Sequence, residues 1–159
     1  MAGITSIGEQ GGATNLVLTF NIGAGTSVTG IGWDLNVTAF TPGWLSELAI
    51  GFGNSALTAG VDLNVGAGDD LAGVGMAYSS GGVIDLIGLN LNFAVGADGI
   101  LRLEFFESFD DAAVDPDGIW NSGFLTLQTV AVVPEPSSYG LMALGLLAVG
   151  TAARRRRRD

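Results

Sequence analysis

The densest group of residues that could support chemistry is the stretch FDDAAVDPDGIW, residues 109–120. Its carboxylates include Asp111, Asp115 and Asp117, and the last is followed by a glycine. Closely spaced oxygen ligands, with a glycine that turns the chain, are typical of calcium loops. The complete 12-residue loop with its terminal acid is absent, so we favour the alternative, a solvated acidic loop. We therefore expect no cofactor, with Ca²⁺ at these three residues as the open alternative.

Catalysis by the rest of the chain has few candidate residues. Glu104 and Glu107 are three apart, so on a strand they face opposite sides and cannot act as a carboxylate pair. The sequence contains no His, no Cys and no Lys, which leaves only carboxylates to activate a nucleophile. We predict that the protein is not an enzyme.

Aromatic side chains offer a different function, because sugar rings stack on them. Trp33 lies in an apolar stripe typical of a core, whereas Trp44 and Trp120 lie in turn-rich segments, so whether they pack in the core or stack on sugars stays open. A surface carbohydrate-binding module is therefore an alternative function.

The charges are divided sharply along the chain. Five of the six basic residues are Arg154, Arg155, Arg156, Arg157 and Arg158. Residues 1–153 hold one arginine and 15 acidic residues, a net charge of −14. Such a body cannot line a groove for a phosphate backbone, so nucleic acid is excluded as a partner.

The elements that must position these residues are short strands with alternating apolar side chains. The predicted strands are 15–22, 29–40, 48–52, 61–65, 75–79, 83–95, 99–109 and 122–133. Paired glycines in the segment 80–82 predict a hairpin turn between the fifth and sixth of them. Strands at this spacing, separated by glycine turns, predict an all-β domain over residues 1–131, an antiparallel β-sandwich or jelly roll.

The alternation also predicts which side chains share a face of each strand. The set includes Leu16, Leu18, Phe20, Ile22, Ile31, Trp33, Leu35, Val37, Ala39, Leu48, Ile50, Phe52, Val61, Leu63, Val65, Val83, Ile87, Leu89, Leu91, Phe93, Val95, Leu101, Leu103, Phe105, Phe109, Leu125, Leu127 and Thr129.

The last segment, residues 132–159, is of another kind. Its residues 139–153 are apolar and uncharged and predict one transmembrane-type helix. That helix would span about 22 Å, which is short of the roughly 30 Å hydrocarbon core. The five arginines that follow form a stop-transfer pattern, which holds the C-terminal end on the cytoplasmic side and leaves the body outside. A buried core helix with a basic tail is the weaker interpretation, because the run is not amphipathic.

The order of Pro134, Glu135 and Pro136, an apolar helix and a terminal arginine cluster resembles the PEP-CTERM protein-sorting signal of Gram-negative bacteria that make exopolysaccharide. The resemblance implies recognition by an exosortase, a membrane enzyme that cuts near the Pro-Glu-Pro. It implies a precursor held in the inner membrane, then a product at the cell surface or outside the cell.

From this resemblance we expect an exported structural or adhesive protein of an exopolysaccharide or biofilm matrix. A permanently membrane-anchored β-domain is the alternative. The first 15 residues carry no basic residue and no sustained apolar run, so no N-terminal export signal is visible in them. Because proteins with this sorting signal normally carry one, we expect a start further upstream.

Overall fold

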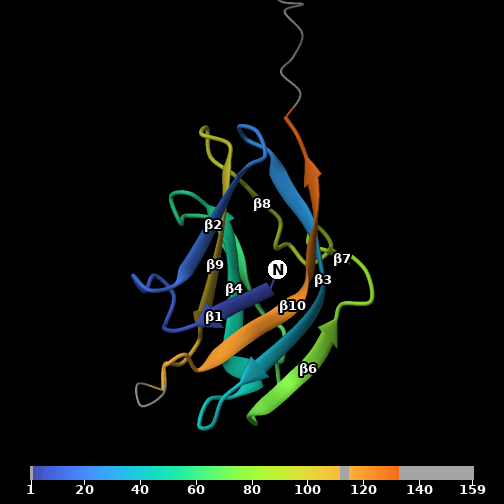
Figure 1. The fold of residues 1–159 in the computed structure, drawn as a ribbon. Helices are drawn as coiled ribbons and strands as arrows, with labels where there is room; N and C mark the ends of the chain where they lie inside the picture. Colours follow the sequence, from blue (N-terminus) through green and yellow to red (C-terminus); the bar gives the residue numbers. More distant parts are fainter. Residues whose placement is uncertain (1, 112–114, 133–159) are drawn as a thin grey trace, which may run out of the picture.

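The computed structural model describes residues 2–111 and 115–132, which form two antiparallel β-sheets that pack face to face (Figure 1). One sheet has the order β1-β10-β3-β6, with β7 and β8 also paired to β3, and the other has the order β2-β9-β4-β5. The strands of the first sheet are β1 (Ala2–Ser6), β10 (Gly118–Val130), β3 (Ser27–Ala39), β6 (Gly73–Ser79), β7 (Ile84–Asp85) and β8 (Phe93–Ala94). Those of the second are β2 (Leu16–Asn21), β9 (Ile100–Glu107), β4 (Leu48–Asn54) and β5 (Gly60–Asn64). The predicted all-β, antiparallel class is confirmed.

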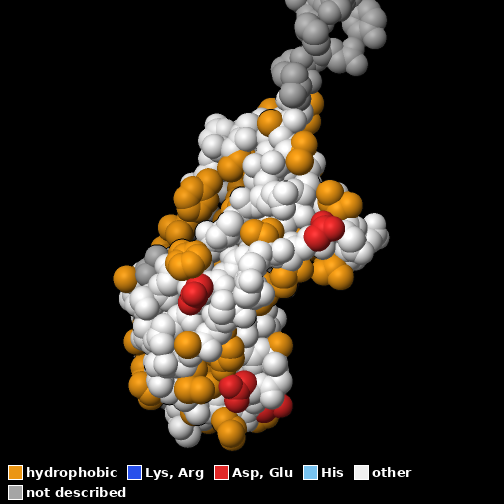
Figure 2. Space-filling model, turned by 90° about the vertical axis from the view of Figure 1, so that its right-hand side faces the viewer, with side chains coloured by type: hydrophobic (Ala, Val, Ile, Leu, Met, Phe, Trp, Pro, Cys, Tyr) orange, Lys and Arg blue, Asp and Glu red, His pale blue; other side chains and the backbone are white. Residues whose placement is uncertain are grey.

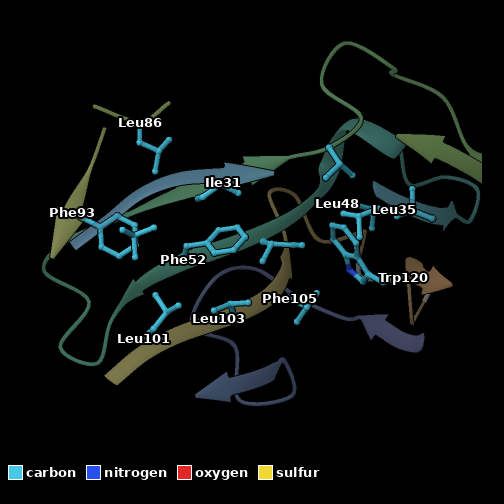
Figure 3. Close-up of a cluster of buried hydrophobic side chains, with 14 of the residues drawn as sticks. Ile31, Leu35, Leu48, Phe52, Leu86, Phe93, Leu101, Leu103, Phe105 and Trp120 are labelled. Carbon is cyan, nitrogen blue, oxygen red and sulfur yellow. The ribbon is translucent and has the colours of Figure 1, made fainter. Parts of the chain in front are cut away.

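The hydrophobic core lies between the two sheets (Figure 3). Alternate residues of β3 supply Ile31, Leu35 and Val37, and the facing strands β4 and β9 supply Phe52 and Phe105 among others. All five are at most 3% exposed. A core side chain of this size contributes about 1.5–3 kcal/mol when it leaves water, so this layer is the main source of stability.

A bulge in β10 turns Trp120 into that core, although simple alternation with Leu125 and Leu127 would point it to the other face. The register with β3 shifts between Trp120 and Ser122, which leaves one extra residue on β10. Because side chains alternate along a strand, the extra residue lets Trp120 and the partly buried Leu125 and Leu127 face the same side. The Trp120 side chain is fully buried and packs edge-on against Phe105, with ring centroids 5.5 Å apart.

The predicted hairpin at residues 80–82 is wrong. The chain does not reverse there: β6, β7 and β8 all pair antiparallel with β3, one after another along the same edge. Gly81 and Gly82 have φ of 68° and 154°, and with Ser80 they form a short outward loop between β6 and β7. Paired glycines therefore permit an extra loop in a continuing edge as readily as a reversal.

Several residues that were predicted to face the core are exposed in the structure. Residues 83–95 form only two short strands, so their side chains do not keep a strict alternation. Strand β9 ends at Glu107, which leaves Phe109 in the following loop, and β2 is an edge strand. The predicted core residues that are exposed instead are Leu16, Phe20, Val83, Ile87, Leu89, Leu91, Phe109 and Thr129.

The predicted C-terminal helix, residues 139–153, lies outside the described residues. Within residues 2–111 and 115–132, the only helical element is the 3₁₀ turn η1 (Leu45–Glu47). No helix in that part of the chain has the length and apolar character needed to cross a bilayer.

Candidate functional site

The acidic loop after β9 brings some of the predicted calcium ligands together and leaves others apart. The backbone N–H of Asp111 donates to Asp117 Oδ2 at 2.9 Å, whereas Asp115 is exposed. Asp117 is only 3% exposed, because it stands directly before β10. Among the described residues, no three acidic side chains gather closely enough to hold a metal ion. The three predicted ligands therefore do not form a ready-made set, and Ca²⁺ binding by them stays a prediction.

Behind the loop, Asp117 contacts a second buried carboxyl group, that of Glu107. Glu107 ends β9 and is 1% exposed, and its N–H donates to the carbonyl of Gly8. Burial, followed by the hydrogen bond and the charge of Asp117, raises the pKa of Glu107 to about 9. Ser6 acts in the opposite direction, and the charge of Asp110 adds to the rise. Glu107 and Asp117 thus form a buried acid pair, in which a hydrogen bond requires one of the two to carry a proton.

Most oxygen atoms of this acid pair have no hydrogen bond of good geometry. Both carboxylate oxygens of Glu107, Oδ1 of Asp117 and the hydroxyl of Ser6 are buried without a partner in good geometry. Buried polar atoms are nearly always satisfied in proteins, so a cluster of unpartnered ones points to a missing ligand, proton or water. The sequence contained a signal for this site, because Glu107 continues the inward alternation of Leu103 and Phe105.

The other buried glutamate of β9, Glu104, has a full set of donors. Its Oε1 accepts hydrogen bonds from Gly11 N at 2.7 Å and Asn15 Nδ2 at 2.8 Å, and its Oε2 pairs with Arg102 at 2.6 Å. Burial alone would raise the pKa of Glu104, but these hydrogen bonds and the charge of Arg102 bring it below its ordinary value. Glu104 and Glu107 have separate partners, as expected for side chains on opposite faces of β9.

A shallow pocket of about 450 Å³ lies over the outer face of the second sheet. Polar side chains of Gln10, Thr58, Asp62 and Arg102 line it, and the amide of Gln10 donates to Asp62 Oδ1 at 3.0 Å. Glycines of β4 and β5 form part of the lining, so the backbone is accessible there. The pocket offers hydrogen-bond donors and acceptors of the kind that sugar hydroxyls use.

The structure separates the two tryptophans that the sequence left open. Trp44 is 45% exposed, so its ring is available to a sugar. Trp120 is fully buried and is not available to a ligand. Trp33 packs partly buried against the core, as its apolar stripe predicted. The hydroxyl of Tyr78 donates to Asp69 Oδ2 at 2.6 Å, which ties β6 to the loop after β5.

The predicted sorting residues lie outside the described part of the chain. They are Pro134, Glu135 and Pro136, and the arginines Arg154, Arg155, Arg156, Arg157 and Arg158.

A family model for the PEP-CTERM protein-sorting motif matches residues 132–158. This match confirms the resemblance that the sequence carries and implies export and processing by an exosortase. No curated protein and no solved structure matches the chain.

Proposed function

We propose that the protein is an exosortase substrate whose β-sandwich is the part delivered to the cell surface or the extracellular matrix. The observation that carries the proposal is the place of the sorting motif. The last strand ends at Val130, and the motif begins at residue 132. A sorting signal attached directly to the end of a folded domain fits a cut that releases that domain whole.

The role proposed for the delivered sandwich is structural or adhesive, in an exopolysaccharide or biofilm matrix. Exposed apolar side chains support contact with other surface molecules. Val74 on β6 is 81% exposed and Leu71 before it is 70% exposed. Figure 2 shows the face of the molecule that carries β6 and β7, with hydrophobic side chains spread over it and few acidic ones. Catalysis is not part of the proposal, because the sequence lacks His, Cys and Lys.

Carbohydrate binding is the second candidate function. The pocket over the outer face of the second sheet supports it, with Gln10, Thr58, Asp62 and Arg102 as polar contacts. Exposed Trp44 is the aromatic candidate. If this candidate is right, Asp62→Asn or Trp44→Ala weakens retention on immobilised exopolysaccharide, while the matched change at the exposed Asp34 of β3, Asp34→Asn, does not. Equal retention of all these variants argues against it.

A permanently anchored β-domain is the third candidate, and one experiment separates it from processing. We expect mass spectrometry of the mature protein from its native host to find a C-terminus near Pro136. Replacing Pro134, Glu135 and Pro136 with alanine should keep the tail on the protein and hold it in the membrane fraction. Recovery of peptides from residues 139–153 in the mature material would contradict the release mechanism and favour the anchored form.

A further inference from the structure

The acid pair Glu107 and Asp117 lies where the end of β1, the end of β9 and the start of β10 meet. Ser6 pairs with Gly118 in the first sheet, while Glu107 pairs with Leu48 in the second. Ser6, Glu107 and Asp117, here called the corner, therefore lie where the two sheets join at one end of the sandwich. No basic side chain neutralises it: Arg102, the one basic residue in the described part of the chain, is bonded to Glu104.

The unpartnered atoms around the pair are mainly oxygens, and all are buried. No hydrogen bond of good geometry reaches Glu107 Oε1 and Oε2, Asp117 Oδ1 or Ser6 Oγ, and their residues are 0–3% exposed. Two carboxylates and a hydroxyl are hard oxygen ligands, which suit Ca²⁺ or Mg²⁺ and not the softer metals. The ligands come from two strands and the loop before a third, and such an irregular set suits Ca²⁺, because Mg²⁺ demands near-ideal octahedral geometry.

A pocket lies next to the corner, because Gly8, which accepts the hydrogen bond of the Glu107 N–H, is part of its lining. This pocket of about 700 Å³ is lined by the segment Ile7–Gly12 and by Asp110 and Asp115. The Asp110 carboxylate and the unpartnered Asn15 Oδ1 both lie 3.8 Å from where a Cβ on Gly8 would stand. Asp110 also lies close enough for its charge to act on Glu107. The acidic lining would attract a cation before it reaches the buried pair.

We propose that this corner is a calcium site, with Glu107 and Asp117 as carboxylate ligands, Ser6 as a hydroxyl ligand and Asp110 at its entrance. The site differs from the calcium loop expected from the sequence, because Asp111 and Asp115 are not its ligands. With two carboxylates as ligands it is a site of modest affinity. A bound ion would fix the ends of β1 and β9 to the start of β10 and so stabilise the sandwich. This inference does not depend on the sorting motif.

Calcium titration of the purified 159-residue chain tests the site. We expect saturable binding of one Ca²⁺ by isothermal titration calorimetry and a rise in Tm of about 4 °C or more over the protein in EGTA. Glu107→Gln should weaken Ca²⁺ binding by about tenfold or more, because it removes a charged ligand. Asp110→Asn, at an exposed position that tolerates substitution, should weaken it by about threefold. Asp34→Asn on β3, the matched control far from the pair in sequence, should bind Ca²⁺ as the wild type does.

Three results would overturn the proposal. The first is an unchanged Tm in millimolar CaCl₂, or a rise that NaCl of equal ionic strength reproduces. The second is wild-type affinity in both Glu107→Gln and Asp110→Asn, which would place the ion on other acidic residues. The third is equal stabilisation by MgCl₂, which would contradict the assignment to calcium. If Glu107→Gln does not fold, the Asp110→Asn and wild-type titrations still decide the question.

Discussion

The two buried glutamates of β9 stand three residues apart and have opposite surroundings. Both side chains are at most 1% exposed. Glu104 receives hydrogen bonds from Gly11, Asn15 and Arg102, and its pKa is lowered, whereas Glu107 faces the carboxyl group of Asp117 and its pKa is raised to about 9. Burial alone therefore does not determine the state of a carboxyl group; its partners do. A satisfied glutamate of this kind serves structure, and an unsatisfied one has capacity left for a proton or an ion.

Removing the cation beside Glu104 is the change with the largest expected effect on this comparison. Arg102→Met should lower the free energy of unfolding by about 3 kcal/mol, because it leaves a buried carboxylate without its countercharge. Urea unfolding of both proteins at pH 7 measures the difference. Asp34→Asn, which alters an exposed residue, should change the value by less than about 0.5 kcal/mol. A loss of similar size in both variants would mean that the ion pair with Glu104 is not what distinguishes the two glutamates.

The pH dependence of stability should separate the two glutamates next. Folding raises the pKa of Glu107 from its ordinary 4.5 to about 9. The protonated Glu107 therefore contributes its full stabilisation below pH 4.5, and this contribution is lost as the pH rises towards 9. In EGTA, the wild type should lose about 2 kcal/mol between about pH 6 and pH 7.5, and Glu107→Gln should lose much less. Glu104 has the opposite sign: its lowered pKa adds stability above 4.5, which is lost as pH falls through the folded value. Parallel pH profiles of wild type and Glu107→Gln would contradict the assignment.

The polar neighbours of the two glutamates should give the smallest effects, and unequal ones. Asn15→Ala removes a donor to Glu104 and should cost about 1–2 kcal/mol. Ser6→Ala, in calcium-free buffer, removes a hydroxyl that has no partner in good geometry and should cost less than about 1 kcal/mol. Thermal unfolding at pH 7 ranks the two. A larger loss from Ser6→Ala would indicate that the hydroxyl already has a strong partner, and the contrast between the two sides of β9 would fail.

The sequence predicted those strands whose alternation continues without interruption. Leu48, Ile50 and Phe52 on β4, and Leu101 and Leu103 on β9, are buried as their spacing predicts. The reason is physical: a strand between two neighbours has one face in the core, so its apolar residues must recur every second position.

The sequence was less informative where a bulge changes which side chains face the core, where a sheet edge continues after a loop, and where the ends of different elements meet. The bulge after Trp120 cannot be seen in a pattern of side chains, so the sequence left open whether this tryptophan lies in the core. Gly81 and Gly82 permit a reversal or an outward loop equally, and only pairing with β3 decides between them. The acid pair was missed because Glu107 ends β9 and Asp117 stands just before β10, and a sequence does not show which strand ends meet.

The end of β10 also limits how far the body can stand from the enzyme that processes it. Pro136 follows Val130 by six residues, and six residues extend to at most about 20 Å. Under the proposed function, an exosortase that cuts near Pro136 has to work within that clearance of the folded sandwich. The size of the enzyme's outer opening, and not only the sequence of the motif, would then determine which cargo can be released. Inserting a flexible spacer after Val132 should leave cleavage unchanged or faster, and slower cleavage would rule this steric limit out.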